Sequence, residues 1–260
     1  DRVYTATNAV QQTSDYVVQE NEQQLYKFTT EFNPNERLQT EYNLLIKSAS
    51  NFENTDLVSS SNSRGASSLE TENIAILKSQ EPSSINQELK AYYTLNEDHI
   101  FSFEAQHLSQ DEDPFYQAIK EIQPFRNILP LDTNQSNFNI NQKRNTSTDK
   151  VEGKLDYYYI LSPKSNLNFT FGITDVSQKF NSNIFQLLDD NSQNKFEDQL
   201  LGNDVDFNFT DAYLSFRYRF ITGIFTIDPG FTIHSYKTNN IQLGNTVSNS
   251  YSDIRPNMRV

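Results

Sequence analysis

The residues best placed to bind a ligand form a short run in the middle of the chain. Asp111, Glu112 and Asp113 are consecutive acids, and Phe115 and Tyr116 follow after one proline. Clustered carboxylates attract a cation or a polar ligand, and exposed aromatic rings offer a flat face on which a sugar can stack. These five residues are therefore the candidate ligand-binding loop of the chain. The alternative, which the sequence favours, is a solvated loop into which the two rings pack.

Two arginines and one oxygen-rich segment are the next candidates. Arg217 and Arg219 share the polar side of an alternating stretch, so we expect both to face a polar interior and to form ion pairs there. Residues 189–194 (DDNSQN) have calcium-loop spacing but lack the glycine and the final glutamate that such loops use. We therefore predict no metal site.

Catalytic constellations are missing from the sequence. It has no cysteine, its 3 histidines are scattered, and neither a G-x-S-x-G motif nor a glycine-rich phosphate loop occurs. Paired carboxylates are plentiful, but acid–base catalysis needs two of them across a cleft with shifted pKa values. We predict no catalytic residue, no cofactor and no enzyme activity. The net charge of -13 argues against nucleic-acid binding.

The elements that must position these residues are β-strands. From Ala212 to Phe220 the even positions are apolar and the odd positions are mostly polar, which is the period of two that a strand with two unlike faces requires. The same alternation recurs in pairs of segments joined by short turns. Four such hairpins occur, with turns near Pro34, Glu97, Lys164 and Thr222.

Long polar stretches separate the four hairpins. These connections run over residues 48–71, 109–149 and 175–203. Short turns therefore fall at one end of the predicted strands and long connections at the other. We expect a short helical turn at Ala118–Ile122, a phase slip or an exit from the apolar face at Thr210–Asp211, and a polar, irregular chain after Tyr236.

The apolar faces of the hairpins allow two architectures. No run of about 18 apolar residues exists, so the sequence predicts no membrane-spanning helix. A soluble sandwich fits the alternation, but such folds have turn signals every 8–12 residues or so. Alternating short and long links, with aromatic residues near the short turns, are typical of outer-membrane barrels. We predict an all-β, antiparallel, up-and-down transmembrane β-barrel region spanning residues 1–260, with about eight visible strands belonging to a larger barrel.

Three segments carry a family resemblance. Residues His99–Phe125, Lys154–Gly172 and Asn203–Tyr236 resemble the outer-membrane barrel of TonB-dependent receptor-like proteins of Bacteroidota. The resemblance implies a bacterial outer-membrane location, contact with outer-membrane lipid, and nutrient uptake through a polar lumen with long outer loops. It also implies a surface lipoprotein and TonB as partners, reached through parts outside this chain, which shows no plug domain. A non-transporting scaffold barrel and a soluble β-rich binding module remain the alternatives.

Overall fold

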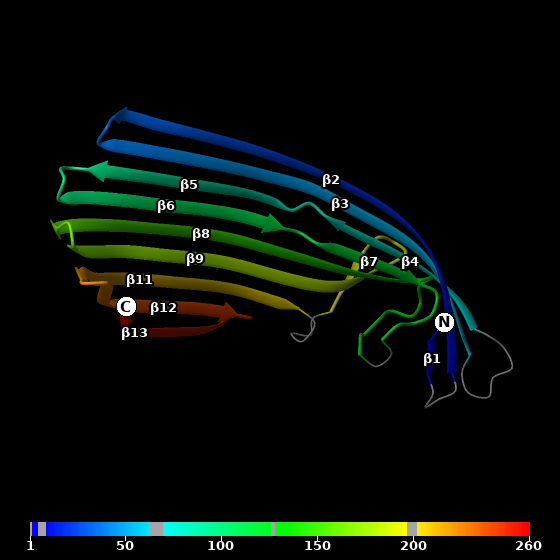
Figure 1. Ribbon diagram of the computed structural model, residues 1–260. Helices are drawn as coiled ribbons and strands as arrows, with labels where there is room; N and C mark the ends of the chain where they lie inside the picture. Colours follow the sequence, from blue (N-terminus) through cyan, green and yellow to red (C-terminus); the bar gives the residue numbers. More distant parts are fainter. Residues whose placement is uncertain (1, 5–8, 63–69, 126–127, 197–201) are drawn as a thin grey trace.

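The computed structural model describes residues 2–4, 9–62, 70–125, 128–196 and 202–260, which form a single curved antiparallel sheet (Figure 1). The described residues contain no helix, and hence none long and apolar enough to cross a membrane. The strands are β1 (Arg2–Tyr4), β2 (Ala9–Asn35), β3 (Leu38–Asn62), β4 (Glu70–Gln80), β5 (Ser83–Thr94), β6 (His99–Glu112), β7 (Phe115–Lys120), β8 (Phe138–Ser162), β9 (Ser165–Leu187), β10 (Gln193–Lys195), β11 (Asn203–Thr222), β12 (Phe225–Gln242) and β13 (Asn245–Arg259).

Strand order in the sheet follows the order of the chain. β4 and β5 occupy one strand position of the sheet, which we call a strand line, because both pair with β3, one after the other along its length. β6 and β7 are likewise two halves of one line paired with β8. Every long line therefore lies beside its sequence neighbour and runs antiparallel to it. The predicted all-β, antiparallel, up-and-down sheet is confirmed.

The four predicted tight turns are confirmed and share one end of the sheet (Figure 1). They join β2 to β3, β5 to β6, β8 to β9 and β11 to β12. A fifth tight turn joins β12 to β13 through Leu243 and Gly244, both at positive φ. We expected an irregular chain there, and that expectation is wrong: β12 runs on to Gln242, and β13 pairs with it along its whole length.

The strands are much longer than the alternation predicts. β2 has 27 residues, and β3 and β8 have 25 each, so they extend into the stretches expected to be connections. The helical turn expected at Ala118–Ile122 is also wrong. That segment lies largely in β7, where β4 on one side and β8 on the other supply the ladder hydrogen bonds.

Hairpin four keeps one register throughout. The pairing runs from Val205 with Gln242 to Thr222 with Phe225 without a shift, so Thr210–Asp211 forms no bulge. Phe207 and Phe209 consequently lie on the same face as Asp211, opposite to Leu214. The expected exit from the apolar face is confirmed instead. The Phe207 and Phe209 rings lie on the polar face, and Phe209 stacks on Tyr236 with 6.2 Å between ring centroids.

The two faces of the sheet differ sharply, and we call them the apolar face and the polar face. The apolar face carries an aromatic row near the tight turns and an aliphatic row next to it. Direct cross-strand partners form the first row, Tyr93, Phe101, Tyr157, Phe169, Phe216 and Phe231. The second row is Phe103, Leu155, Phe171, Leu214, Ile233 and Ile254.

Burial on these faces is the reverse of that in a soluble protein. Phe171 is 55% exposed and Leu214 is 51% exposed, whereas Thr170 and Asp156 on the polar face are only 8% and 6% exposed. Side chains converge on the inside of a curved sheet and diverge on its outside. The polar face is therefore the inner side of the curl, and the apolar face is the outer side.

The apolar part of the outer side is a band of limited height. Along β8 it extends over nine residues from Tyr159 to Val151, and beyond Val151 the same face carries Asp149 and Ser147. The eight steps between the first and the last of these residues span about 27 Å along a strand. At a strand tilt of about 40° the height of the band is about 21 Å.

A small apolar core lies at the end of the sheet away from the four turns. Leu129, Ile140 and Phe196 form it, where segment 128–137 folds over β8 and β9. Gln186 is fully buried beneath that segment and exchanges two hydrogen bonds with the Asp132 backbone, at 2.8 and 2.9 Å. The segment is thus held down by a side chain of the sheet.

Two strand edges lack partners in the described residues. β13 pairs with β12 alone, and β2 beyond its short contact with β1 pairs with β3 alone. In the part of the chain that the structure describes, the sheet is therefore open and curved, and it is not closed into a barrel.

Candidate functional site on the polar face

Ion pairs cross the middle strands of the polar face. The Lys154 ammonium lies 3.4 Å from Glu104 and 3.2 Å from Asp156, bridging β6 and β8. Thr170 on β9 donates a hydrogen bond to Asp156, which extends the network by one strand. Side chains of opposite charge on neighbouring strands attract one another, and these ion pairs stabilise the packing of charged groups on the polar face.

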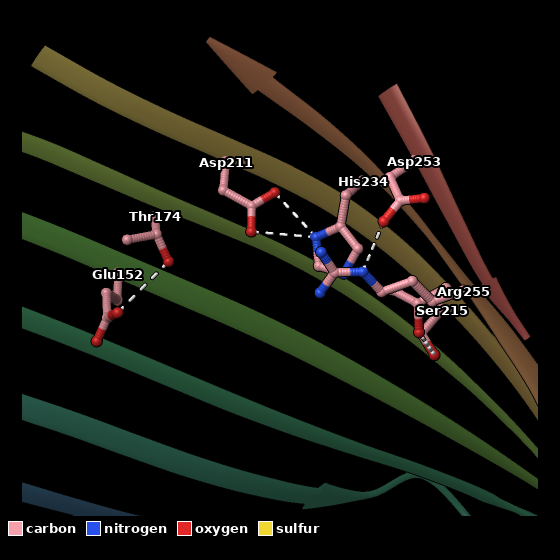
Figure 2. A network of polar contacts seen from close by, with 8 residues as sticks. Glu152, Thr174, Asp211, Ser215, His234, Asp253 and Arg255 are labelled. Carbon is pink, nitrogen blue, oxygen red and sulfur yellow. Dashed lines mark hydrogen bonds and ion pairs between the residues drawn. The ribbon is translucent and has the colours of Figure 1, made fainter. Parts of the chain in front are cut away.

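A second polar network lies on β11, β12 and β13 (Figure 2). The His234 Nδ1 atom is 3.0 and 3.1 Å from the two carboxylate oxygens of Asp211. A carboxylate only accepts, so Nδ1 carries the proton that His234 donates. Arg255 Nε donates to Asp253 at 2.7 Å, and the guanidinium carbon Cζ of Arg255 lies 5.8 Å from the centre of the Tyr236 ring.

This second network does not form a nucleophile–base pair. Ser215 lies beside it, but its hydroxyl donates to the Phe231 carbonyl at 3.3 Å and accepts from Thr232 at 3.0 Å. Its proton is therefore directed to the backbone and away from His234. The imidazole instead stacks on Tyr236, with 5.1 Å between ring centroids. The arrangement is suited to holding a polar wall in place.

Arg217 and Arg219 both lie on the polar face, in the same alternation as Ser215. Arg219 Nε is 4.0 Å from the Asp228 carboxylate on β12, which makes one ion pair of the expected kind. No such pair is found for Arg217 among the described residues. It remains a prediction that Arg217 and Arg219 face a water-filled lumen.

The predicted binding loop of Asp111, Glu112, Asp113, Phe115 and Tyr116 is a break in a strand line and not a loop. Asp111 and Glu112 end β6, and Phe115 and Tyr116 begin β7. Alternation places Asp111 and Glu112 on opposite faces, so the three carboxylates do not gather. Asp113 accepts the Glu81 backbone N–H at 2.8 Å.

Two prolines produce matching breaks in adjacent strand lines. Pro82 separates β4 from β5, and Pro114 separates β6 from β7. Proline has no N–H to donate, so it cannot hold a place inside a ladder. Its carbonyl still accepts a hydrogen bond in both breaks, from Ala49 and from Arg144, each at 3.0 Å. The breaks lie side by side because Asp113 links them.

A groove opens on the polar face at these breaks, and we call it the proline groove. Its larger part has a volume of about 400 Å³. The lining contains three aromatic residues, Phe52, Phe115 and Tyr116, and polar groups that include Glu53, Lys78 and Arg144. A smaller part of about 260 Å³ adjoins it, because the two share Gln80, Pro114 and Arg144. Three of the five predicted ligand residues therefore line the groove, Phe115 and Tyr116 in the larger part and Glu112 in the smaller part.

In the proline groove, Glu53 and Lys78 form an ion pair, whereas the Arg144 guanidinium has no partner among the described residues. The Glu53 carboxylate accepts from the Lys78 ammonium at 2.6 Å and from the Gln19 amide at 2.7 Å. The Lys78 ammonium, followed by the Gln19 amide, holds the pKa of Glu53 below its usual range. The Arg144 guanidinium has no hydrogen bond or ion pair to any described residue, although it lies within the cavity lining.

Sequence reasoning missed Gln19, Glu53, Lys78 and Arg144. They belong to four different strands, β2, β3, β4 and β8, and only the sheet brings them together. The one signal in the sequence was the pair of prolines, each preceded by an acid, inside stretches that otherwise alternate.

The other oxygen-rich segment has a structural role. Asp189 accepts the backbone N–H and the hydroxyl of Ser136, both at 2.9 Å, and Asp190 accepts the Ser192 N–H at 2.8 Å. The Ser192 bonds also hold the pKa of Asp190 below its usual range. Among the described residues, no group of three or more histidine, cysteine or acidic side chains is arranged to hold a metal ion.

Comparison with known proteins gives structural neighbours and no sequence relatives. No protein-family model matches the chain, and no curated protein matches it. The ferric citrate transporter FecA in its unliganded form aligns with a TM-score of 0.46 at 10% identity, over 96% of this chain and 41% of FecA. The outer-membrane protease OmpT from Escherichia coli aligns with a TM-score of 0.25 at 7% identity, over 95% and 92% of the two chains.

This chain thus spans less than half the length of FecA.

Proposed function

We propose that this chain forms part of the wall of an outer-membrane β-barrel, with its apolar face against lipid and its polar face lining an aqueous lumen. The observation that carries the proposal is the reversed burial of the two faces. Phe171 is exposed while its neighbour Thr170 is buried, and this pattern repeats from strand to strand. A lipid layer is the surrounding in which an exposed apolar band of this height is favourable.

The dimensions of the band support the same proposal. Its height of about 21 Å fits the hydrocarbon layer when the strands are tilted. The aromatic row from Tyr93 to Phe231 lies close to the tight turns, where aromatic rings of barrels meet the membrane interface. The tight turns would then face the periplasm, and the extended strand ends would project outward.

A soluble binding module is disfavoured by the same surface. Soluble proteins rarely expose continuous apolar patches larger than a few hundred Å². The two rows of the apolar face place a dozen large apolar side chains side by side on adjacent strands, and they include Leu155, Phe171 and Leu214, all more than 40% exposed. In water such a surface would associate with other copies.

Within this membrane proposal, the function that we favour is nutrient uptake by a receptor-like barrel dependent on TonB. Support comes from the resemblance of three sequence segments to that family and from a cavity on the lumen side beyond the membrane band. A plug, TonB contacts and a surface lipoprotein belong to parts of the assembly outside these residues.

The test uses the full-length protein. Cells are fractionated, and the purified protein is run on a gel with and without boiling in detergent. Recovery in the outer membrane together with a mobility shift on boiling supports the membrane wall. A protein that remains folded and monodisperse in buffer without detergent overturns it. Growth of a deletion strain on defined nutrients then separates an uptake receptor, which leaves a growth defect on one substrate, from a scaffold barrel, which leaves none.

A further inference from the structure

We propose that the proline groove binds an acidic sugar, that is, a hydroxyl-rich ring carrying a carboxylate, with Arg144 as the group that pairs with the carboxylate. This inference rests on the proposed function only for the orientation of the groove, which would face the lumen on the outer side of the membrane. The binding chemistry is argued from the groove alone.

Position makes the groove accessible to a solute. Arg144 is seven residues beyond Val151, the last apolar residue of the band on β8. Seven residues correspond to about 24 Å along a strand. The groove is therefore well above the hydrocarbon layer and opens on the polar face, where a solute would arrive from outside.

Charge in the groove leaves one cation for a ligand, next to the Glu112 carboxylate, which lines the smaller part and accepts a hydrogen bond from the Gln110 amide at 2.6 Å. Lys78 is already neutralised by Glu53 at 2.6 Å, so it offers little net attraction to a ligand. Arg144 has no such partner in the described part of the chain, in a protein whose net charge is -13. A guanidinium is planar and matches a carboxylate with two parallel hydrogen bonds. Arg144 is therefore the position where the acid group of a ligand would bind.

Hydroxyl recognition needs groups that both donate and accept, because each sugar hydroxyl does both. Carboxamides have this property. Gln19 and Gln142 line the groove. Within the described residues only the amide nitrogen of each is used, for Glu53 at 2.7 Å and for Ser182 at 3.3 Å. Their carbonyl oxygens remain available to accept from ligand hydroxyls.

An apolar wall completes the site. Tyr116 pairs with Gln142 and lies on the polar face, so its ring is the one in the groove that can contact the C–H face of a sugar ring, whereas Phe115 pairs with Lys143 and points to the opposite face. The volume of about 400 Å³ lies within the range of small-molecule sites. One cation, several carboxamides and the Tyr116 ring together fit a hydroxyl-rich acid better than a bare anion, which would leave the amides and the ring without a role.

The experiment measures binding by isothermal titration calorimetry on full-length protein in detergent micelles. The probe is trigalacturonic acid, and the neutral comparison is a galactose trisaccharide. We expect the acidic probe to bind at least tenfold more tightly than the neutral one. Arg144→Gln should weaken binding of the acidic probe at least tenfold and leave binding of the neutral sugar within twofold.

The matched control is Lys143→Gln. Lys143 is the next residue on β8, points to the opposite face, is exposed, and loses the same charge on substitution. Its binding should stay within twofold of the parent protein. Equal losses of affinity for trigalacturonic acid in the two variants would show that the net charge of the protein explains the effect, and would overturn the proposal.

Two further outcomes separate this inference from the proposed function. A protein that passes the membrane test but binds neither sugar, or binds both equally, overturns the acidic-sugar site and leaves the membrane wall standing. A protein that fails the membrane test but binds trigalacturonic acid through Arg144 supports the site and overturns the wall. A heat-modifiability shift of each variant equal to that of the parent protein verifies folding.

Discussion

Replacing Phe171 by arginine tests the orientation of the sheet most directly. Phe171 lies on β9 beside Leu155 on β8 and Leu214 on β11, and its side chain is 55% exposed. Its row is four residues from either end of the apolar band along β8, which runs from Tyr159 to Val151. If the band lies in lipid, position 171 is at the middle of the membrane.

The expected magnitude follows from that depth. Placing an arginine on the lipid face of a barrel costs about 2–4 kcal/mol at the midplane and about 0–1 kcal/mol near the interface. Phe171→Arg should therefore lower the free energy of unfolding by about 2–4 kcal/mol, whereas Val151→Arg at the edge of the band should lower it by no more than about 1 kcal/mol. An exposed position in water would respond within about 0.5 kcal/mol.

The assay is urea-induced unfolding in phosphatidylcholine vesicles, read from the heat-modifiable band on a gel. Tyr16→Arg is the control, because Tyr16 is a 69% exposed aromatic residue on the same face, far beyond the band. That variant should unfold within about 0.5 kcal/mol of the parent protein. Equal effects at positions 171 and 16 would refute the lipid orientation, and so would a large effect at position 151 that matches the one at 171.

Two further predictions concern single contacts. Gly172→Ala places a Cβ 2.1 Å from the Tyr213 ring, so the ring must leave its place over β9, and we expect a loss of about 1 kcal/mol in urea unfolding. Glu121 accepts the Asn73 N–H at 3.0 Å and its side-chain amide at 3.2 Å, which hold the pKa of Glu121 below its usual range. The carboxylate therefore stabilises the fold above the unfolded value of about 4.3, and this contribution is lost as the pH falls through the lower folded value.

Each of these predictions has its own control. In a Tyr213→Ala background, Gly172→Ala should leave the free energy of unfolding unchanged or raise it, since alanine is better than glycine in a strand once the ring is gone. If Gly172→Ala still lowers the free energy of unfolding by the same amount, the clash with Tyr213 is not the cause. For Glu121, urea unfolding of the parent protein and of Glu121→Gln should differ at pH 7 and converge on acidification. A difference that grows as the pH falls would have the wrong sign.

Turn positions were predictable because their chemistry is local. Asn33-Pro34 and Ser162-Pro163 are strong breaks, and the flanking alternation identifies the strands. Strand length was not predictable, because both faces of a strand are polar once it leaves the apolar layer. β13 is the extreme case: only Ile254 and a few other apolar residues interrupt a polar segment, and its pairing with β12 defines it as a strand.

The candidate site was only partly predictable for a related reason. Phe115 and Tyr116 stood out because they follow an acidic run, and both line the proline groove. The acidic run itself was misread: backbone alternation separates Asp111 from Glu112, and Asp113 is used to tie two strand breaks together. Arg144 carried no signal, since its importance comes from partners on other strands that are distant in the sequence.

The two unpaired strand edges have a consequence for the environment that the sheet can tolerate. β13 and β2 each present a row of N–H and C=O groups without partners in the described residues. Burying each unpaired N–H or C=O group in a hydrocarbon layer costs several kcal/mol of free energy. A sheet with unpaired edge strands is therefore unstable in lipid even when one of its faces is apolar. In water the same margins would recruit further strands and favour fibrous aggregates. In either surrounding, the stability of the sheet therefore depends on partners for the free edges of β2 and β13.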